Sequence, residues 1–175
     1  MKAFLCLVVI LVVFCGIVEA FYNPATKKEE LIFISERREV NIGRSLSKAV
    51  EKQFKLYDDV LLQKKIDDIG QRLAKCSDRT NIEYYFKVID KDDVNAFCLP
   101  GGYVYVFKGL LDKVKSDDEI AGVLAHEIGH IVARHAIKKM QAALGMDILL
   151  ALSMQVKATT YSRAKANAAL GQLMV

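Results

Sequence analysis

The sequence predicts an α+β domain in which a small β-sheet lies between helical segments. Two stretches before residue 76 carry apolar residues at helical spacing, and three short segments between residues 84 and 107 are rich in aromatic and β-branched residues. A long, well-capped helix follows these segments. Because the strands succeed one another without an intervening helix, we expect a small sheet rather than alternating β-α-β units.

The composition is that of one folded domain. The chain has 175 residues, of which 53% are hydrophobic and 26% are charged, so it can form a packed core. Its 25 basic and 21 acidic residues give a net charge of +4. The basic residues are scattered, and pairs such as Lys27-Lys28 and Lys138-Lys139 are too short for a phosphate-binding stripe. We therefore expect no nucleic-acid partner.

The first twenty residues have the pattern of a secretory signal peptide. Lys2 precedes an uncharged apolar run over residues 3–18, and Val18-Glu19-Ala20 offers small residues for cleavage before Phe21. We expect residues 1–20 to be removed and residues 21–175 to form a single domain in a bacterial periplasm. The alternative is an uncleaved anchor, although the run is shorter than the about 20 residues of a membrane span. Any other membrane association would be peripheral.

Cys76 and Cys98 are the two cysteines that remain after such a cleavage. One disulfide between them and two separate buried thiols are both compatible with an oxidising compartment.

Extended structure and two helices are expected before the strands. Residues 21–34 hold an Asn-Pro pair and an apolar run, which favour an extended segment. Ser35 can cap a helix over residues 36–54. A second helix fits residues 58–75, with five residues facing inward: Leu61, Leu62, Ile66, Ile69 and Leu73.

Three strands are expected, at residues 84–89, 94–99 and 103–107. Pro100-Gly101-Gly102 favours a turn between the last two. Asn95 and the two glycines are either plain turn residues or the mark of a sheet edge to which an extended substrate adds as a strand. The last strand alternates valines with aromatic residues, which predicts one core face and one surface face, the aromatic residues being Tyr103, Tyr105 and Phe107.

The next helix has the clearest start. Ser116 and Glu119 form a Ser-x-x-Glu capping box, which satisfies two of the free N–H groups at a helix N-terminus. We expect this helix to run to about Leu144 and to stop at Gly145. The Ala-rich residues 161–175 favour a further helix.

His126, Glu127 and His130 form a His-Glu-x-x-His motif inside that helix. Residues four apart lie on one helical face, so the two imidazoles can bind one Zn²⁺ ion. Glu127 is turned about 100° from His126 and can act as a general base without binding the metal. The motif therefore predicts metal-assisted peptide hydrolysis, against the simpler interpretation of an amphipathic helix with two incidental histidines.

His135 follows His130 by five residues, which places it away from the metal-facing side of a continuous helix. A role on the helix surface or behind the ligands is expected rather than metal ligation.

The run from Glu119 to His135, Glu-Ile-Ala-Gly-Val-Leu-Ala-His-Glu-Ile-Gly-His-Ile-Val-Ala-Arg-His, resembles the active-site helix of peptidase family M48. Residues 95–103, Gly109-Leu110-Leu111 and Tyr161-Ser162-Arg163 also resemble segments of that family, and the resemblance is good over about residues 23–145. It implies a zincin-like fold of the gluzincin type, one Zn²⁺, and unfolded or damaged cell-envelope polypeptides as substrates.

The tail departs from the family's pattern. The family's third zinc ligand is a Glu in a Ser-Arg-x-x-Glu-x-x-Ala-Asp segment, whereas Ala166 and Leu170 occupy the positions of the Glu and of the Asp here. A catalytic zinc site needs three protein ligands. Four interpretations stay open: a truncated or altered product with an incomplete C-terminal end, an inactive relative that binds substrates or partners, and a substitute ligand from Asp147 or from Cys98.

Overall fold

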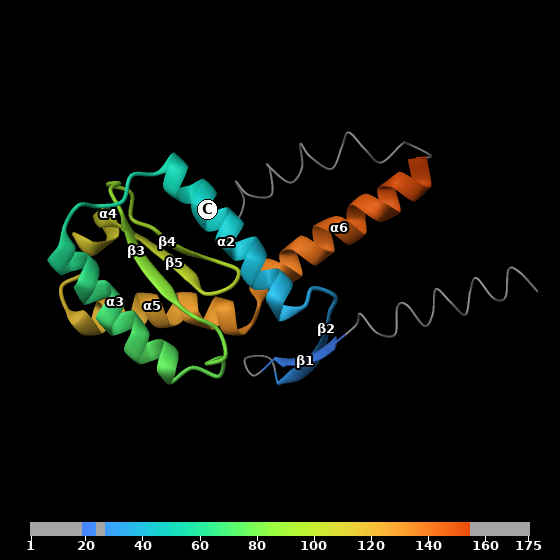
Figure 1. Cartoon of the computed structure of the whole chain (residues 1–175), viewed down its shortest axis with the longest axis horizontal. Helices are drawn as coiled ribbons and strands as arrows, with labels where there is room; N and C mark the ends of the chain where they lie inside the picture. The colour runs from blue at the N-terminus through green and yellow to red at the C-terminus, as the bar shows by residue number, and fades with distance from the viewer. Residues whose placement is uncertain (1–18, 24–26, 155–175) are drawn as a thin grey trace, which may run out of the picture.

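The computed structural model describes residues 19–23 and 27–154 of the chain (Figure 1). All but the last two residues of the predicted signal peptide therefore lie outside the described residues. The same is true of the predicted tail helix, including Ala166 and Leu170. The described part is a mixed α+β fold with a small sheet, as the order of the sequence patterns predicts.

A β-hairpin opens the described chain. Strands β1 (Glu19–Asn23) and β2 (Lys28–Ile32) pair in antiparallel fashion, and β1 begins two residues before the segment expected to be extended. The predicted cleavage point after Ala20 lies inside β1, where Ala20 is opposite Leu31. Cleavage itself stays a prediction.

Two helices follow close to their expected bounds. Helix α2 (Glu36–Gln53) begins after Ser35, and α3 (Val60–Lys75) begins after Asp59, whose carboxylate accepts from the N–H groups of Leu61 and Leu62 at 3.0 Å. The inward position predicted for Leu61 is wrong, because its side chain is 81% exposed. It lies in the first turn of α3, outside the stripe that packs on the sheet.

The sheet has three strands in the order β3-β5-β4. Strand β3 (Tyr85–Ile89) is parallel to β5 (Tyr103–Phe107), and β4 (Ala96–Leu99) is antiparallel to β5. The predicted turn between β4 and β5 is confirmed, with Gly101 and Gly102 at φ of +74° and +97°. Such angles favour glycine because side chains clash there.

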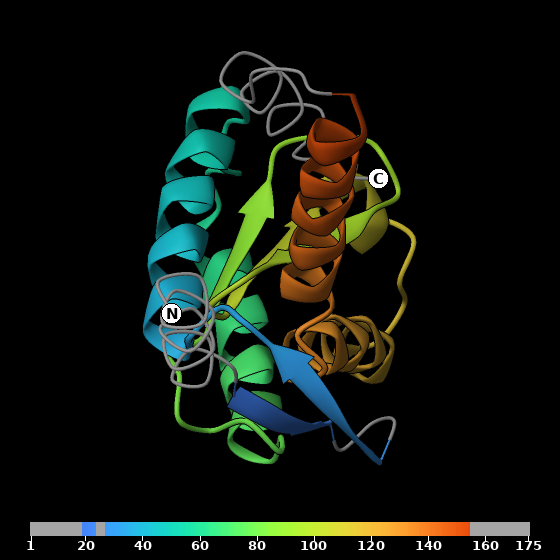
Figure 2. The ribbon, with the colours of Figure 1, turned by 90° about the vertical axis from the view of Figure 1, so that its right-hand side faces the viewer.

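Helices cover both faces of the sheet (Figures 1 and 2). The valines of β5 pack toward α3 and α5, while its aromatic residues pack toward α2 with Val50 and Phe97. The predicted division of this strand into one core face and one surface face is therefore wrong, since Tyr103, Tyr105 and Phe107 are buried as well as the valines. Because β5 is the central strand and α2 lies across it, every residue of β5 is buried.

The long C-terminal helix is divided in two. After the short α4 (Lys108–Leu111), helix α5 (Asp117–Val132) begins with the Ser116 hydroxyl accepting from the Glu119 N–H, as predicted. The expected continuation to Leu144 is wrong, because Arg134 adopts a φ of +51° and interrupts the helix. Helix α6 (His135–Met154) leaves in a new direction and continues through Gly145 (Figure 2).

In the described part of the chain, no helix is both long enough and apolar enough to cross a membrane.

A buried ion cluster joins α2 to the end of α5. The Glu39 carboxylate is 1% exposed and accepts hydrogen bonds from both terminal nitrogens of Arg79 at 2.9 and 3.0 Å. It also accepts from Nε of Arg134 at 2.8 Å. Arg79 donates to the carbonyl of Ile131 in the last turn of α5, and Arg134 donates to the carbonyl of Ile34. The cluster thus ties four separate segments together.

Replacing Glu39 should destabilise the fold severely. Glu39→Ala leaves two buried guanidinium groups without their carboxylate, which costs about 3–5 kcal/mol of unfolding free energy. Equilibrium unfolding in urea measures this loss.

Asp68→Ala is the matched control, because Asp68 pairs with Lys64 on the exposed face of α3. We expect a change within about 0.5 kcal/mol there. Equal losses in the two variants would contradict the central role of Glu39.

Candidate functional site

The two motif histidines lie one turn apart on α5, with their Nε2 atoms 3.1 Å apart. Two nitrogens bound at 2.0–2.1 Å to one tetrahedral ion are separated by about 3.3 Å. His126 is exposed and His130 is half-buried, so their shared side opens toward solvent. The pair therefore fits two ligands of a zinc ion with almost no rearrangement.

Glu127 lies between the helix and the sheet. Its side chain is only 8% exposed, and it accepts a hydrogen bond from the thiol of Cys98 on β4. Burial raises the pKa of the Cys98 thiol, and the charge of Glu127 raises it further. Both effects favour the protonated form of the Cys98 thiol beside the carboxylate.

A groove runs alongside the motif. It has a volume of about 630 Å³ and is lined by His126 and Glu127, by the start of β4, and by apolar residues of α4, of α5 and of the loops beside them. The apolar lining consists of Val94, Ala96, Leu110, Val114 and Val123. Val94 is 58% exposed at the rim, so the groove presents unshielded apolar surface next to the histidines.

The two outer edges of the sheet differ in whether their main-chain groups are hydrogen-bonded. The outer edge of β3 is covered, since the Gln63 amide bonds to the main chain of Phe86 and Val88, and Gln71 bonds to the carbonyl of Tyr84. No other described residue hydrogen-bonds to the outer edge of β4. This edge borders the groove, as the sheet-edge interpretation of Asn95 predicts.

His130 is held between two other imidazoles. Its Nε2 faces His126, and its Nδ1 lies 2.6 Å from Nδ1 of His135. Burial lowers the pKa of His130, and the neighbouring His126 and His135 lower it further. The negative charge of Glu127 acts in the opposite direction and raises this pKa, but the net shift is downward. The ring is therefore kept neutral, as a metal ligand must be.

The structure does not supply a third ligand among the described residues, where no group of three His, Cys, Asp or Glu side chains could hold a metal. Asp147 lies in α6, about 18 Å along the axis from His135. The hypothesis that Asp147 substitutes as a ligand stays a prediction, because its side chain is not among those described. Cys98 contacts Glu127 instead of joining the histidines.

Two contacts could not be predicted from the sequence. The approach of His135 to His130 depends on the left-handed backbone of Arg134, and sequence gave no sign of it because arginine rarely adopts this conformation. The contact of Cys98 with Glu127 depends on how α5 crosses β4, which spacing along the chain does not reveal.

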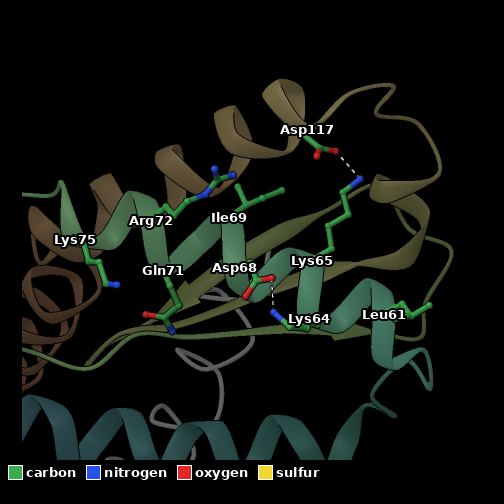
Figure 3. A pocket seen from close by; sticks show the side chains of 9 residues that line it. All are labelled: Leu61, Lys64, Lys65, Asp68, Ile69, Gln71, Arg72, Lys75 and Asp117. Atoms are coloured by element: carbon green, nitrogen blue, oxygen red, sulfur yellow. Dashed lines mark hydrogen bonds and ion pairs between the residues drawn. The ribbon is translucent and has the colours of Figure 1, made fainter.

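A second hollow lies between α3 and the start of α5 and encloses about 640 Å³ (Figure 3). Lys64 pairs with Asp68 one turn along α3, and Lys65 reaches Asp117 of α5. The hollow is lined by neither histidine nor cysteine, and the two ion pairs involve four of its six charged side chains. His126 and Glu127 line the other groove instead.

Comparison with known proteins places the motif in context. The sequence model of peptidase family M48 matches residues 61–175. This match extends through the tail, beyond the region of good resemblance, and includes the Ser162-Arg163 segment.

Several characterised relatives are proteases by name. The mitochondrial metalloendopeptidase OMA1 of Arabidopsis thaliana is 40% identical over 98 residues, which are 56% of this chain and 20% of the relative. A putative beta-barrel assembly-enhancing protease of Vibrio cholerae is 30% identical over 126 residues, which are 66% of this chain and 26% of the relative. The mitochondrial metalloendopeptidase OMA1 of Bos taurus is 29% identical over 136 residues, which are 73% of this chain and 26% of the relative. The chain thus spans a fifth to about a quarter of the length of these relatives.

The two described cysteines should differ sharply in reactivity. Both are free thiols in the structure, and Cys76 is exposed whereas Cys98 is partly buried against Glu127. Because the thiolate is the reactive form, iodoacetamide should alkylate Cys76 at least roughly tenfold faster than Cys98 in the folded protein. Peptide mapping by mass spectrometry measures both rates, and a denatured sample should show equal labelling. A Cys76–Cys98 cross-linked peptide or equal native rates would contradict this arrangement.

Proposed function

Because the chain belongs to peptidase family M48, we propose that it forms the core of a zinc-dependent metalloendopeptidase of the zincin-like, gluzincin type. His126 and His130 are two of the zinc ligands and Glu127 is the general base. The observation that carries this proposal is the 3.1 Å approach of the two Nε2 atoms, with the Glu127 carboxylate beside them at the groove.

The chain's own residues account for the proton transfers of peptide hydrolysis. When bound, zinc lowers the pKa of a water molecule and polarises the scissile carbonyl. Glu127 accepts a proton from the attacking water and donates it to the departing amine. Glu127 is buried beside Cys98, which restricts the movement of its carboxylate. The lowered pKa of His130 favours the neutral ring, whose lone pair a metal requires.

The groove favours an extended, unfolded polypeptide as substrate. An extended segment can add to the open edge of β4 by main-chain hydrogen bonds. Alternate side chains of that segment then meet the apolar lining formed by Val94, Val114 and Val123. Unfolded chains expose apolar side chains, so unfolded or damaged envelope polypeptides match this surface. The periplasmic location rests on the N-terminal signal pattern, since named relatives include mitochondrial proteins.

A second candidate function is binding of unfolded polypeptides without cleavage. The observation in its favour is Ala166, which stands where the family has its third ligand. An inactive or altered relative would keep the groove and the open β4 edge while holding zinc weakly.

Zinc binding provides the first test. We expect the purified full chain to bind one zinc ion, with the affinity measured by competition against a chromophoric chelator. His126→Ala should abolish this binding because it removes one of the ligands, and Glu127→Gln should keep it. If the wild-type chain binds no zinc yet captures a permanently unfolded polypeptide, the binding function replaces the enzymatic one.

Proteolysis provides the second test. Cleavage of unfolded casein should fall about 10²–10⁴-fold in Glu127→Gln, because the general base is lost while the shape of the groove is kept. Glu29→Gln makes the same chemical change at an exposed position of β2 and should leave the rate unchanged. Equal rates in Glu127→Gln and the wild type would refute the assigned role.

A further inference from the structure

The junction between α5 and α6 brings a third histidine back to the motif. In an uninterrupted helix, a residue five positions after His130 would lie roughly 140° around the axis and about 7.5 Å along it. Here α5 ends at Val132, Arg134 takes a φ of +51°, and α6 restarts at His135. As a result the Nδ1 atoms of His130 and His135 are 2.6 Å apart.

This junction is held firmly from the core. Arg134 is buried, with Nε bonded to Glu39 at 2.8 Å and a terminal nitrogen bonded to the Ile34 carbonyl at 2.7 Å. The Arg134 carbonyl accepts from the Lys138 N–H at the start of α6. A left-handed arginine is unfavourable by itself, so its surroundings must impose the conformation. The position of His135 is therefore built into the fold.

The two ring nitrogens of His130 face different partners. Nε2 is directed toward His126, on the side proposed for zinc, and Nδ1 is directed toward His135. A neutral imidazole carries one proton, and ligation through Nε2 requires that proton on Nδ1. An acceptor at Nδ1 stabilises that tautomer and also fixes the rotation of the ring.

We propose that His135 is this acceptor: its Nδ1 receives a hydrogen bond from the Nδ1–H of His130 and keeps the His130 Nε2 lone pair free for the metal. This inference rests on the proposed zinc site and makes His135 a positioning residue. It is not a ligand of the same ion, because the Nδ1 atom that faces His130 is occupied by the hydrogen bond. His135 in turn carries its own proton on Nε2.

The proposal is tested first without metal. Two-bond ¹H–¹⁵N correlation spectra of the metal-free full chain report which nitrogen of His130 is protonated. We expect Nδ1–H in the wild type, a shift toward Nε2–H in His135→Phe, and retention of Nδ1–H in His135→Gln, whose amide oxygen can accept the same bond. Leu144→Phe adds a phenyl ring at an exposed position of the same helix and should leave the tautomer unchanged.

Zinc affinity gives the second readout. His135→Phe should weaken binding roughly 10–100-fold, and His135→Gln should restore most of it. An Nε2–H tautomer of His130 in the wild type overturns the inference, whether or not His135→Phe folds. If His135→Phe folds and keeps both the tautomer of His130 and the zinc affinity of the wild type, the inference is overturned as well. A wild-type chain with the Nδ1–H tautomer but no zinc binding refutes the metal site and leaves the hydrogen-bond assignment standing.

Discussion

The buried carboxylate of Glu39 is the interaction on which the arrangement of the described helices depends. Two arginines converge on it, one from the loop before β3 and one from the α5–α6 junction. Half-exposed Glu36 makes a longer contact of 3.5 Å with Arg79. The carbonyls of Ile131 and Ile34 accept further hydrogen bonds from the two guanidinium groups. Buried charges are costly unless every one is paired. The segments that carry them must therefore assemble together, and no buried side-chain nitrogen or oxygen in the described part lacks a partner.

The same ion cluster also contacts the end of the helix that carries the His-Glu-x-x-His motif. Arg79 binds the carbonyl of Ile131 one residue after His130, and Arg134 imposes the backbone reversal that ends α5. Helix α5 therefore stops soon after the motif, and His135 returns to the ring of His130. A structural ion cluster far from solvent thus sets the geometry of a half-exposed imidazole, which links the stability of the fold to the orientation of a proposed ligand.

The sheet supports the site through an asymmetry between its edges. Glutamine side chains of α3 close the outer edge of β3, whereas the edge of β4 lies open beside the groove. An unpaired edge invites aggregation unless it is covered or used. In this family member the open edge borders His126 and Glu127, so the proposed main-chain pairing and the proposed hydrolysis would act on the same extended polypeptide. The sequence has Ala166 at the position where the family pattern has a glutamate, so tight zinc binding by this chain stays a prediction.

Local patterns in the sequence determined the kinds of element, the cap at Ser116, the turn at Gly101-Gly102, and the pairing of His126 with His130 on one helical face. Each of these depends on residues within a few positions of one another. The cap expected at Ser35 makes no side-chain hydrogen bond, whereas Asp59 caps the second helix. The tertiary structure alone decided that α2 buries the aromatic face of β5, that α5 ends at Val132, and that Cys98 meets Glu127. Those features arise from contacts between residues far apart in the chain, such as Glu39 with Arg134, and helical periodicity carries no information about them.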